Sequence, residues 1–153
     1  MPTLNLSRQI QAPVSVVYRM MLDKPTYEQW AAAFEPSSTV EGTWEAGTKM
    51  YFTSKDQEGK RYGMVSEVME HIPGKIVSLL HRGILDGDQE ITEGPKVAPW
   101  VNLREIYRFT GQNGLTTVSI EQDIPDTYKA FFESAWEQAL DKLKSLCEAK
   151  SGQ

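Results

Sequence analysis

The chain has 153 residues, of which 40% are hydrophobic and 24% charged, and its formal net charge at pH 7 is -5. This length suits a single domain, residues 1–153, that can bury a core without disulfide bonds. Because nucleic-acid-binding proteins concentrate Lys and Arg on one surface, the acidic balance argues against a nucleic-acid partner.

The composition also argues against several kinds of site. The single cysteine, Cys147, cannot form an intrachain disulfide, and without a recognisable secretory leader the sequence predicts a cytoplasmic protein. His71 and His81 do not stand at a known metal-ligand spacing, and no phosphate-binding glycine loop is present. We therefore expect neither a metal nor another cofactor. No apolar run approaches the ~20 residues of a membrane span.

The N-terminal part predicts one strand followed by two short helices. Residues 3–10 alternate apolar and polar side chains, which is the period of a half-buried strand. Residues 12–23 change to a helical period, with a proline suited to the first turn. Residues 25–34 predict a second short helix, with Trp30 and Phe34 four residues apart on one side.

Strand patterns then occupy the middle of the chain. Turn residues separate most of them, so neighbouring strands should pair antiparallel. The exception is the segment 83–99, which is acidic, rich in turn residues and long enough to predict a functional or mobile loop. The six predicted strands are 38–44, 47–54, 61–70, 75–82, 100–109 and 116–123.

A long amphipathic helix is predicted from about Asp126 to about Ala149. Apolar residues recur there at three- and four-residue steps, so one face is buried. That face can belong to a solid core, or it can cover a hollow that holds a guest. The small residues Ala135 and Ala139 favour a hollow, because they leave volume to be occupied. The face comprises Tyr128, Phe132, Ala135, Trp136, Ala139, Leu140, Leu143 and Leu146.

The order of these elements predicts an α+β fold: a seven-stranded antiparallel sheet wrapped around the long C-terminal helix, with two short helices between strands one and two. One helix covers only part of the concave face of a twisted sheet, so a cavity between them is geometrically reasonable.

Several segments also resemble one known superfamily across nearly the whole chain. The chain resembles the SRPBCC superfamily, which has the helix-grip fold of START domains and birch-pollen allergens, and within it the chaperone-ATPase-activator-like branch. The matching segments are IQAPVSVVYRMMLD, YEQW, EAGTKMYF, GMVSEVMEHIPGKIVSL, EIYRF with the preceding Trp100, and IPDTYKAFFESAWEQALDKLKSL. The resemblance implies a cavity under the long helix that binds small apolar or amphipathic molecules. It also implies that a minority of members are cyclases, dehydratases or lyases.

Strand parity points to Glu105 as the polar group of such a cavity. If Leu103, Tyr107 and Phe109 face the helix, Glu105 faces inward with them, whereas Arg104 stays outside. His81 and Gln122 fall on the inward faces of the two strands expected nearby, and Tyr107 supplies a further hydroxyl to the same polar set. These polar groups could anchor a guest or serve as general acid and base. Alternatively, Glu105 lies at the open end of the sheet and meets water or an arginine.

The apolar walls of the cavity are expected to consist of aromatic and methionine side chains, which form adaptable surfaces. Trp100, just after the 83–99 segment, is expected to cover the mouth, and that segment is expected to gate it. The wall residues are Trp30, Phe34, Met50, Phe52, Met64, Phe132 and Trp136.

Three functions remain open on the sequence. The first is binding of a small hydrophobic or amphipathic molecule. The second is a cofactor-independent enzyme of the cyclase, dehydratase or lyase type that uses the pocket Glu and His; no catalytic residue is assigned. The third is a chaperone-partner or stress-response interaction protein. An exposed strand edge would also permit a homodimer.

Overall fold

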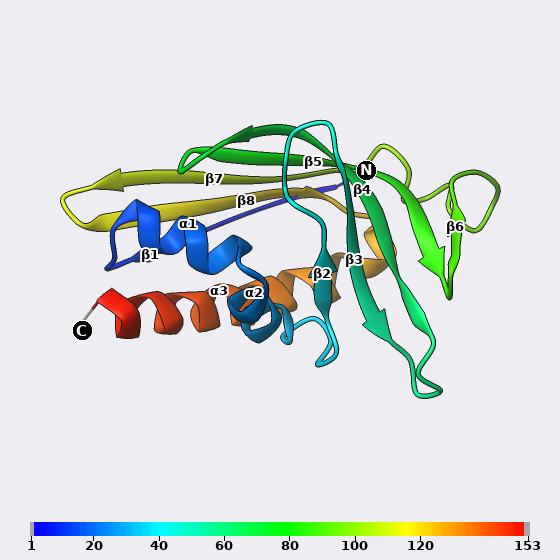
Figure 1. Ribbon diagram of the computed structural model, residues 1–153, viewed down its shortest axis with the longest axis horizontal. Coiled ribbons are helices and arrows are strands. Elements are labelled where there is room, and N and C mark those ends of the chain that lie inside the picture. Colours follow the sequence, from blue (N-terminus) through cyan, green and yellow to red (C-terminus); the bar gives the residue numbers. More distant parts are fainter. Residues whose placement is uncertain (1, 152–153) are drawn as a thin grey trace.

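A computed structural model of the chain describes residues 2–151 and confirms the α+β helix-grip fold (Figure 1). The described chain begins with strand β1 (Thr3–Ile10), helix α1 (Val14–Leu22) and helix α2 (Lys24–Ala31). It ends with a 3-10 turn (Asp126–Tyr128) and the long helix α3 (Lys129–Ser151). The strands between them are β2 (Thr39–Glu41), β3 (Lys49–Lys55), β4 (Arg61–Ile72), β5 (Ile76–Asp86), β6 (Gln89–Ile91), β7 (Arg104–Gln112) and β8 (Leu115–Asp123).

The strands form one curled antiparallel sheet. Within residues 2–151, seven strands lie in the order β1-β8-β7-β5-β4-β3-β2, and the short β6 pairs with the far end of β5. Strands β1 and β8, the first and last along the chain, are therefore neighbours in the sheet, with Leu4 opposite Gln122. Figure 1 shows all three helices on the concave side of the sheet.

Alternation along the strands decides which side chains face the helices. In β8, Val118, Ile120 and Gln122 are buried in turn, and Val77, Leu79 and His81 are buried in β5. These are the inward sets that the sequence predicts, because one face of each strand must pack on the helices.

The short helices α1 and α2 meet at Asp23, whose backbone is extended and ends α1. Two buried indole N–H groups donate hydrogen bonds to the free carbonyl groups at the end of α1. Trp30 Nε1 donates to Met21 O at 3.2 Å, and Trp44 Nε1 donates to Leu22 O at 3.1 Å. These bonds fix α2 against α1 and thereby orient the face of α2 that carries Trp30.

Helix α3 is buried along only part of its length. From Ala135 onward, the inward residues Trp136, Leu140 and Leu143 are almost fully buried. The N-terminal end differs: Phe131 is 54% exposed, and Tyr128 is 43% exposed in the 3-10 turn. The predicted burial of Tyr128 is thus wrong, because the chain has not yet entered the α-helix at that position. The less covered end of α3 leaves room beside the sheet.

The predicted loop at residues 83–99 is partly wrong as well. Its first half continues β5 to Asp86, turns at Gly87 and returns as β6, with Ile84 opposite Ile91. A glycine at positive φ directly after a strand favours a tight hairpin. The following strand is shifted relative to the prediction, since β7 is Arg104–Gln112 rather than residues 100–109.

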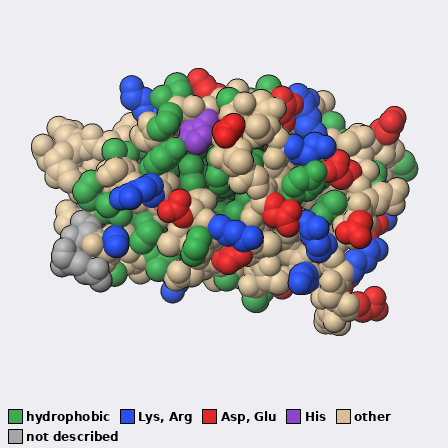
Figure 2. Space-filling view, viewed as in Figure 1, with side chains coloured by type: hydrophobic (Ala, Val, Ile, Leu, Met, Phe, Trp, Pro, Cys, Tyr) green, Lys and Arg blue, Asp and Glu red, His purple; other side chains and the backbone are tan. Residues whose placement is uncertain are grey.

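Charges of both signs are interspersed over the face of the molecule that Figure 2 shows. None of the helices in the described part of the chain has the length and apolar character needed to cross a membrane.

Candidate functional site

A pocket of about 170 Å³ lies between the concave face of the sheet and helices α2 and α3. It sits beside the N-terminal half of α3, where the helix is least covered. Its wall is formed by α2, the strands β3, β4, β5, β7 and β8, and the start of α3. The lining residues are Tyr27, Trp30, Ala31, Phe34, Ser38, Phe52, Thr53, Ser54, Met64, His81, Trp100, Glu105, Tyr107, Gln122, Asp123, Phe132 and Trp136.

Aromatic rings from α2 and α3 form the apolar wall. The rings of Trp30 and Trp136 stack with their centroids 5.6 Å apart, and the rings of Phe34 and Trp136 meet in a T-shaped arrangement with their centroids 5.0 Å apart. Phe34 also lies 5.7 Å from Phe132. Helical spacing explains the arrangement, because Tyr27, Trp30 and Phe34 recur at steps of three and four on one face of α2 and the turn that follows it. This wall is large and apolar.

Polar side chains gather at the sheet end of the pocket. Strand pairing places Glu105 of β7 between Leu79 of β5 and Gln122 of β8. The Tyr107 hydroxyl donates a hydrogen bond to Glu105 Oε2, and His81 Nε2 lies 3.5 Å from Glu105 Oε1. The Glu105 side chain is only 13% exposed. A carboxylate, an imidazole and a phenol therefore meet in a setting with little water.

The neighbours of this cluster orient its members. Ser66, on the adjacent strand β4, has its Oγ 2.7 Å from His81 Nδ1. Trp136 Nε1 donates to Gln122 Oε1 at 2.6 Å. Because an indole nitrogen can only donate, this bond fixes the Gln122 carbonyl toward Trp136 and its amide nitrogen away from the ring. Helix α3 and the sheet are thus joined by a buried hydrogen bond at the pocket wall.

Both phenols of the pocket are held neutral by their surroundings. Burial, reinforced by the Glu105 carboxylate, raises the pKa of Tyr107 well above its ordinary value. The same two causes, in the same order, raise the pKa of Tyr27. Burial disfavours a phenolate, and a neighbouring negative charge disfavours it further. Both side chains therefore act as hydroxyl groups.

The Tyr27 hydroxyl has no hydrogen-bond partner among the described residues, although Tyr27 is only 7% exposed. In the described part of the chain, no fully buried side-chain nitrogen or oxygen lacks a partner. The Tyr27 hydroxyl is therefore accessible to solvent, and Tyr27 lines the pocket.

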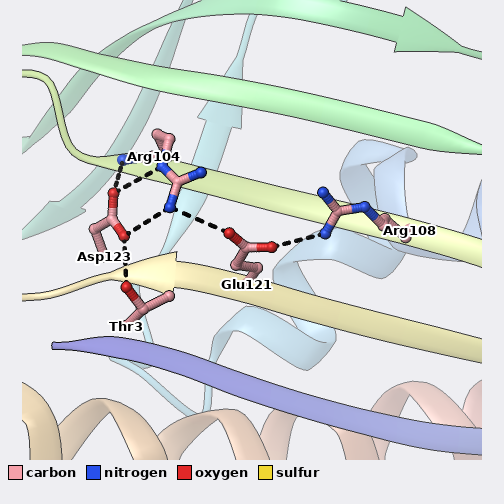
Figure 3. Close-up of polar contacts among 5 residues, drawn as sticks. All are labelled: Thr3, Arg104, Arg108, Glu121 and Asp123. Atoms are coloured by element: carbon pink, nitrogen blue, oxygen red, sulfur yellow. Dashed lines mark hydrogen bonds and ion pairs between the residues drawn. The ribbon is translucent and has the colours of Figure 1, made fainter.

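A charged network on β7 and β8 pairs Arg104 and Arg108 outside the pocket (Figure 3). Arg104 donates to Asp123 through its backbone N–H at 3.0 Å and through Nε at 3.1 Å, and Thr3 donates to the same carboxylate at 2.9 Å. Arg104 and Arg108 also pair with Glu121. Asp123 borders the pocket, but its charge is already compensated by Arg104.

Burial alone would raise the pKa of Asp123, but the hydrogen bonds from Arg104 and Thr3 outweigh it and lower that pKa. The network therefore depends on an ionised Asp123, and it ties the ends of β1, β7 and β8 together beside Gln122.

Of the twelve residues that the sequence proposes for ligand contact, all but Met50 line this pocket. Met50 is fully buried, and its Sδ accepts a hydrogen bond from the Trp44 backbone N–H at 3.2 Å. Strand parity does place Met50 and Phe52 on the same face, but the segment before β3 covers Met50. The prediction that Met50 lines the pocket is therefore wrong. Ligand contact by the other eleven residues stays a prediction.

Sequence reasoning missed several lining residues, of which Tyr27 matters most. Tyr27 precedes Trp30 by three residues on α2, so helical periodicity was the signal that could have found it. Ser38, Thr53, Ser54 and Asp123 have no such signal, since they reach the pocket through strand pairing and turns. Ala31 follows Trp30 directly and is 2% exposed.

Trp100 is one of the lining residues that the sequence predicts. Its ring centroid is 5.0 Å from that of Tyr128, at the start of the C-terminal helical segment, and Trp100 lines the pocket. Trp100 and Tyr128 thus form an aromatic pair at this part of the wall. That Trp100 covers the mouth and that the preceding segment gates the pocket stay predictions.

The other histidine has a structural role. His71 Nδ1 lies 2.7 Å from the Trp44 carbonyl oxygen and Nε2 lies 2.5 Å from the Tyr18 hydroxyl. Because a carbonyl only accepts, Nδ1 carries the proton and donates to Trp44. Across residues 2–151, no group of three or more His, Cys, Asp and Glu side chains is arranged to hold a metal ion.

Comparison with known proteins places these features in a family. The family model described as Activator of Hsp90 ATPase homolog 1-like protein matches residues 11–148. No curated protein matches the chain.

Solved structures share the fold at low sequence identity. Protein CV1439 from Chromobacterium violaceum is 19% identical with a TM-score of 0.73, covering 95% of this chain and 96% of that one. A structure described as the Aha1 dimer from Colwellia psychrerythraea is 18% identical with a TM-score of 0.68, covering 97% of each chain. DynU16, a protein of the dynemicin biosynthetic locus, is 15% identical with a TM-score of 0.67, covering 97% of this chain and 48% of that one. At these identities the likeness concerns the fold alone.

Proposed function

The chain belongs to the Activator of Hsp90 ATPase homolog 1-like family, a branch of the SRPBCC superfamily, and we propose that this protein binds a small hydrophobic or amphipathic molecule in the pocket between the sheet and α3. The observation that carries the proposal is the composition of the pocket. Stacked aromatic rings form one side, and a few convergent polar groups, led by Glu105, form the other. This combination is typical of small-molecule sites.

The size of the pocket limits the guest. An engineered cavity of about 150 Å³ is enough for benzene, whereas pockets for drug-sized ligands measure about 300–1,000 Å³. The volume of about 170 Å³ therefore suits a molecule with one ring and a short substituent. A longer guest would have to displace side chains at the mouth, such as Trp100.

Titration with toluene tests the proposal, because three tryptophans line the pocket and report on its occupancy by fluorescence. Wild type should show a saturable change. Ala31→Leu, which extends a buried side chain into the pocket, should weaken binding at least about tenfold. Ala130→Leu makes the same change at an exposed site of α3 and serves as the control.

Thermal melts of both variants establish that they are folded before binding is compared. Equal affinity of wild type and Ala31→Leu, or no saturable change with wild type, would contradict binding in this pocket. Native mass spectrometry of protein purified from its own host would then identify the natural guest by its mass.

A second candidate function, cofactor-independent catalysis by proton transfer, is favoured by one observation. His81 Nε2 and Glu105 Oε1 lie 3.5 Å apart inside the pocket, and a paired imidazole and carboxylate can carry a proton between substrate atoms. Once a guest is identified, its conversion by wild type and by His81→Gln separates the two functions. A guest recovered unchanged after prolonged incubation with wild type supports binding alone.

A further inference from the structure

The charge balance of the pocket limits the chemistry of the guest. No lysine or arginine is among the described residues that line it. Arg104, the cation nearest in sequence to Glu105, is on the outer face of the sheet and is paired with Asp123 and Glu121. Asp123 is compensated by Arg104, but among the described residues Glu105 has only neutral or titratable partners, the Tyr107 hydroxyl and the His81 ring.

A buried carboxylate with spare acceptor capacity needs further donors. An ionised carboxylate offers about four lone-pair sites, and Tyr107 and His81 engage one oxygen each. Burying such a charge is unfavourable unless it is paired and hydrogen-bonded. A guest with a positively charged donor would complete the set, whereas an anionic guest would add a second negative charge in a setting with little water.

The rest of the pocket favours the same sign of charge. Aromatic faces attract cations, and Trp30, Trp136 and Phe34 line the same pocket as Glu105. The unpartnered Tyr27 hydroxyl, on a side chain that is 7% exposed, can accept a hydrogen bond from the guest. Gln122 is neutral, and its carbonyl is already occupied by Trp136, so it does not change the sign of the pocket.

We infer that the guest is a small organic amine: one aromatic ring packed against the wall formed by Trp30, Phe34 and Trp136, with a protonated amino group that donates to Glu105 and to the Tyr27 hydroxyl. This inference rests on the proposed function, since it specifies what the same pocket binds. Carboxylates of the same size are excluded by Glu105. Alcohols bind more weakly than amines, because a hydrogen bond between two ions is stronger than one with a neutral donor.

A matched series of probes tests the inference by calorimetric titration at neutral pH: 2-phenylethylamine, 2-phenylethanol, ethylbenzene and phenylacetate. They share the ring and a two-carbon arm and differ in the group at its end, which is cationic, a neutral hydroxyl, apolar or anionic. The amine should bind at least about tenfold more tightly than the alcohol, and phenylacetate should bind most weakly.

Glu105→Gln should remove the preference for the amine over the alcohol and leave the affinity for ethylbenzene unchanged. Glu67→Gln removes the same charge outside the pocket, where Glu67 pairs with Arg82, and should retain the preference. Tyr27→Phe should weaken the amine more than ethylbenzene. Thermal melts establish that each variant is folded.

The outcomes separate the inference from the proposed function. Equal affinities for the amine and the alcohol, tightest binding of phenylacetate, or an unchanged preference in Glu105→Gln would overturn the amine assignment while leaving a binding pocket. Failure of all four probes to bind wild type would overturn both.

Discussion

Replacing Trp136 by alanine tests whether the wall of the pocket also holds the fold together. Trp136 is 2% exposed, and its ring packs on Trp30, Phe34 and Tyr107 with centroid distances of 5.6, 5.0 and 6.0 Å. Its N–H also satisfies the Gln122 carbonyl at 2.6 Å. The change removes all of these contacts and leaves a buried acceptor without its partner.

The expected loss of stability follows from this packing. Replacing a buried aromatic side chain by alanine costs about 3–5 kcal/mol. Because Trp136 borders an existing pocket, fewer contacts surround it than in a solid core. We therefore expect a loss near the lower end of the range, about 3 kcal/mol. Phe131→Ala, at the 54% exposed neighbour on the same helix, should change stability by about 0.5 kcal/mol or less.

Urea melts of wild type and both variants measure these differences, provided the dependence on denaturant concentration is unchanged. A loss for Trp136→Ala of about 1 kcal/mol or less would refute the packing described here, because it falls below the range for a buried aromatic residue. A loss equal to that of Phe131→Ala would refute it as well.

Three further predictions test other parts of the structure. Cys147 should not react with a thiol reagent at about pH 8 until the protein unfolds, since burial, with a contribution from Glu148, raises its pKa to about 12; rapid labelling of native protein would contradict its burial. Asp123 has a folded-state pKa below its ordinary 3.8, so its contribution to stability is present above that value and is lost as the pH falls through the folded-state pKa. Urea melts from about pH 5 to about pH 2 should therefore show a smaller loss of stability in acid for Asp123→Asn than for wild type. Equal losses would exclude the role of the Arg104 network. Gly63→Ala should cost about 2 kcal/mol or more, because the added methyl group would collide with the backbone carbonyl of Phe52, whereas Gly47→Ala, whose added methyl meets open space, should cost less in the same melts; similar costs would contradict the close approach of β3 and β4.

The inward position of Glu105 could be predicted from the sequence because its neighbours leave one choice. Tyr107 and Phe109 must be buried and Arg104 must stay in water, so alternation in β7 turns Glu105 inward. The approach of His81 to Glu105 was harder to predict from the sequence. It depends on the pairing of β5 with β7, which joins residues far apart in the chain and is set by the whole sheet.

Other features depended on local signals that are easily misread. The acidic segment after residue 83 resembles a loop, but Gly87 closes a hairpin within it, and the pairing of Ile84 with Ile91 becomes evident only in the structure. Met50 follows the correct parity, yet it is covered by the segment around Trp44. The volume of the pocket could not be predicted at all, because it is the space left between side chains of α2, α3 and five strands.

A crystal structure with bound 2-phenylethylamine tests the central claim most directly. The account predicts the ring of the guest among Trp30, Phe34 and Trp136, and its amino group within hydrogen-bond distance of Glu105. A guest bound elsewhere on the molecule, with the space between the sheet and α3 unchanged, would contradict the account.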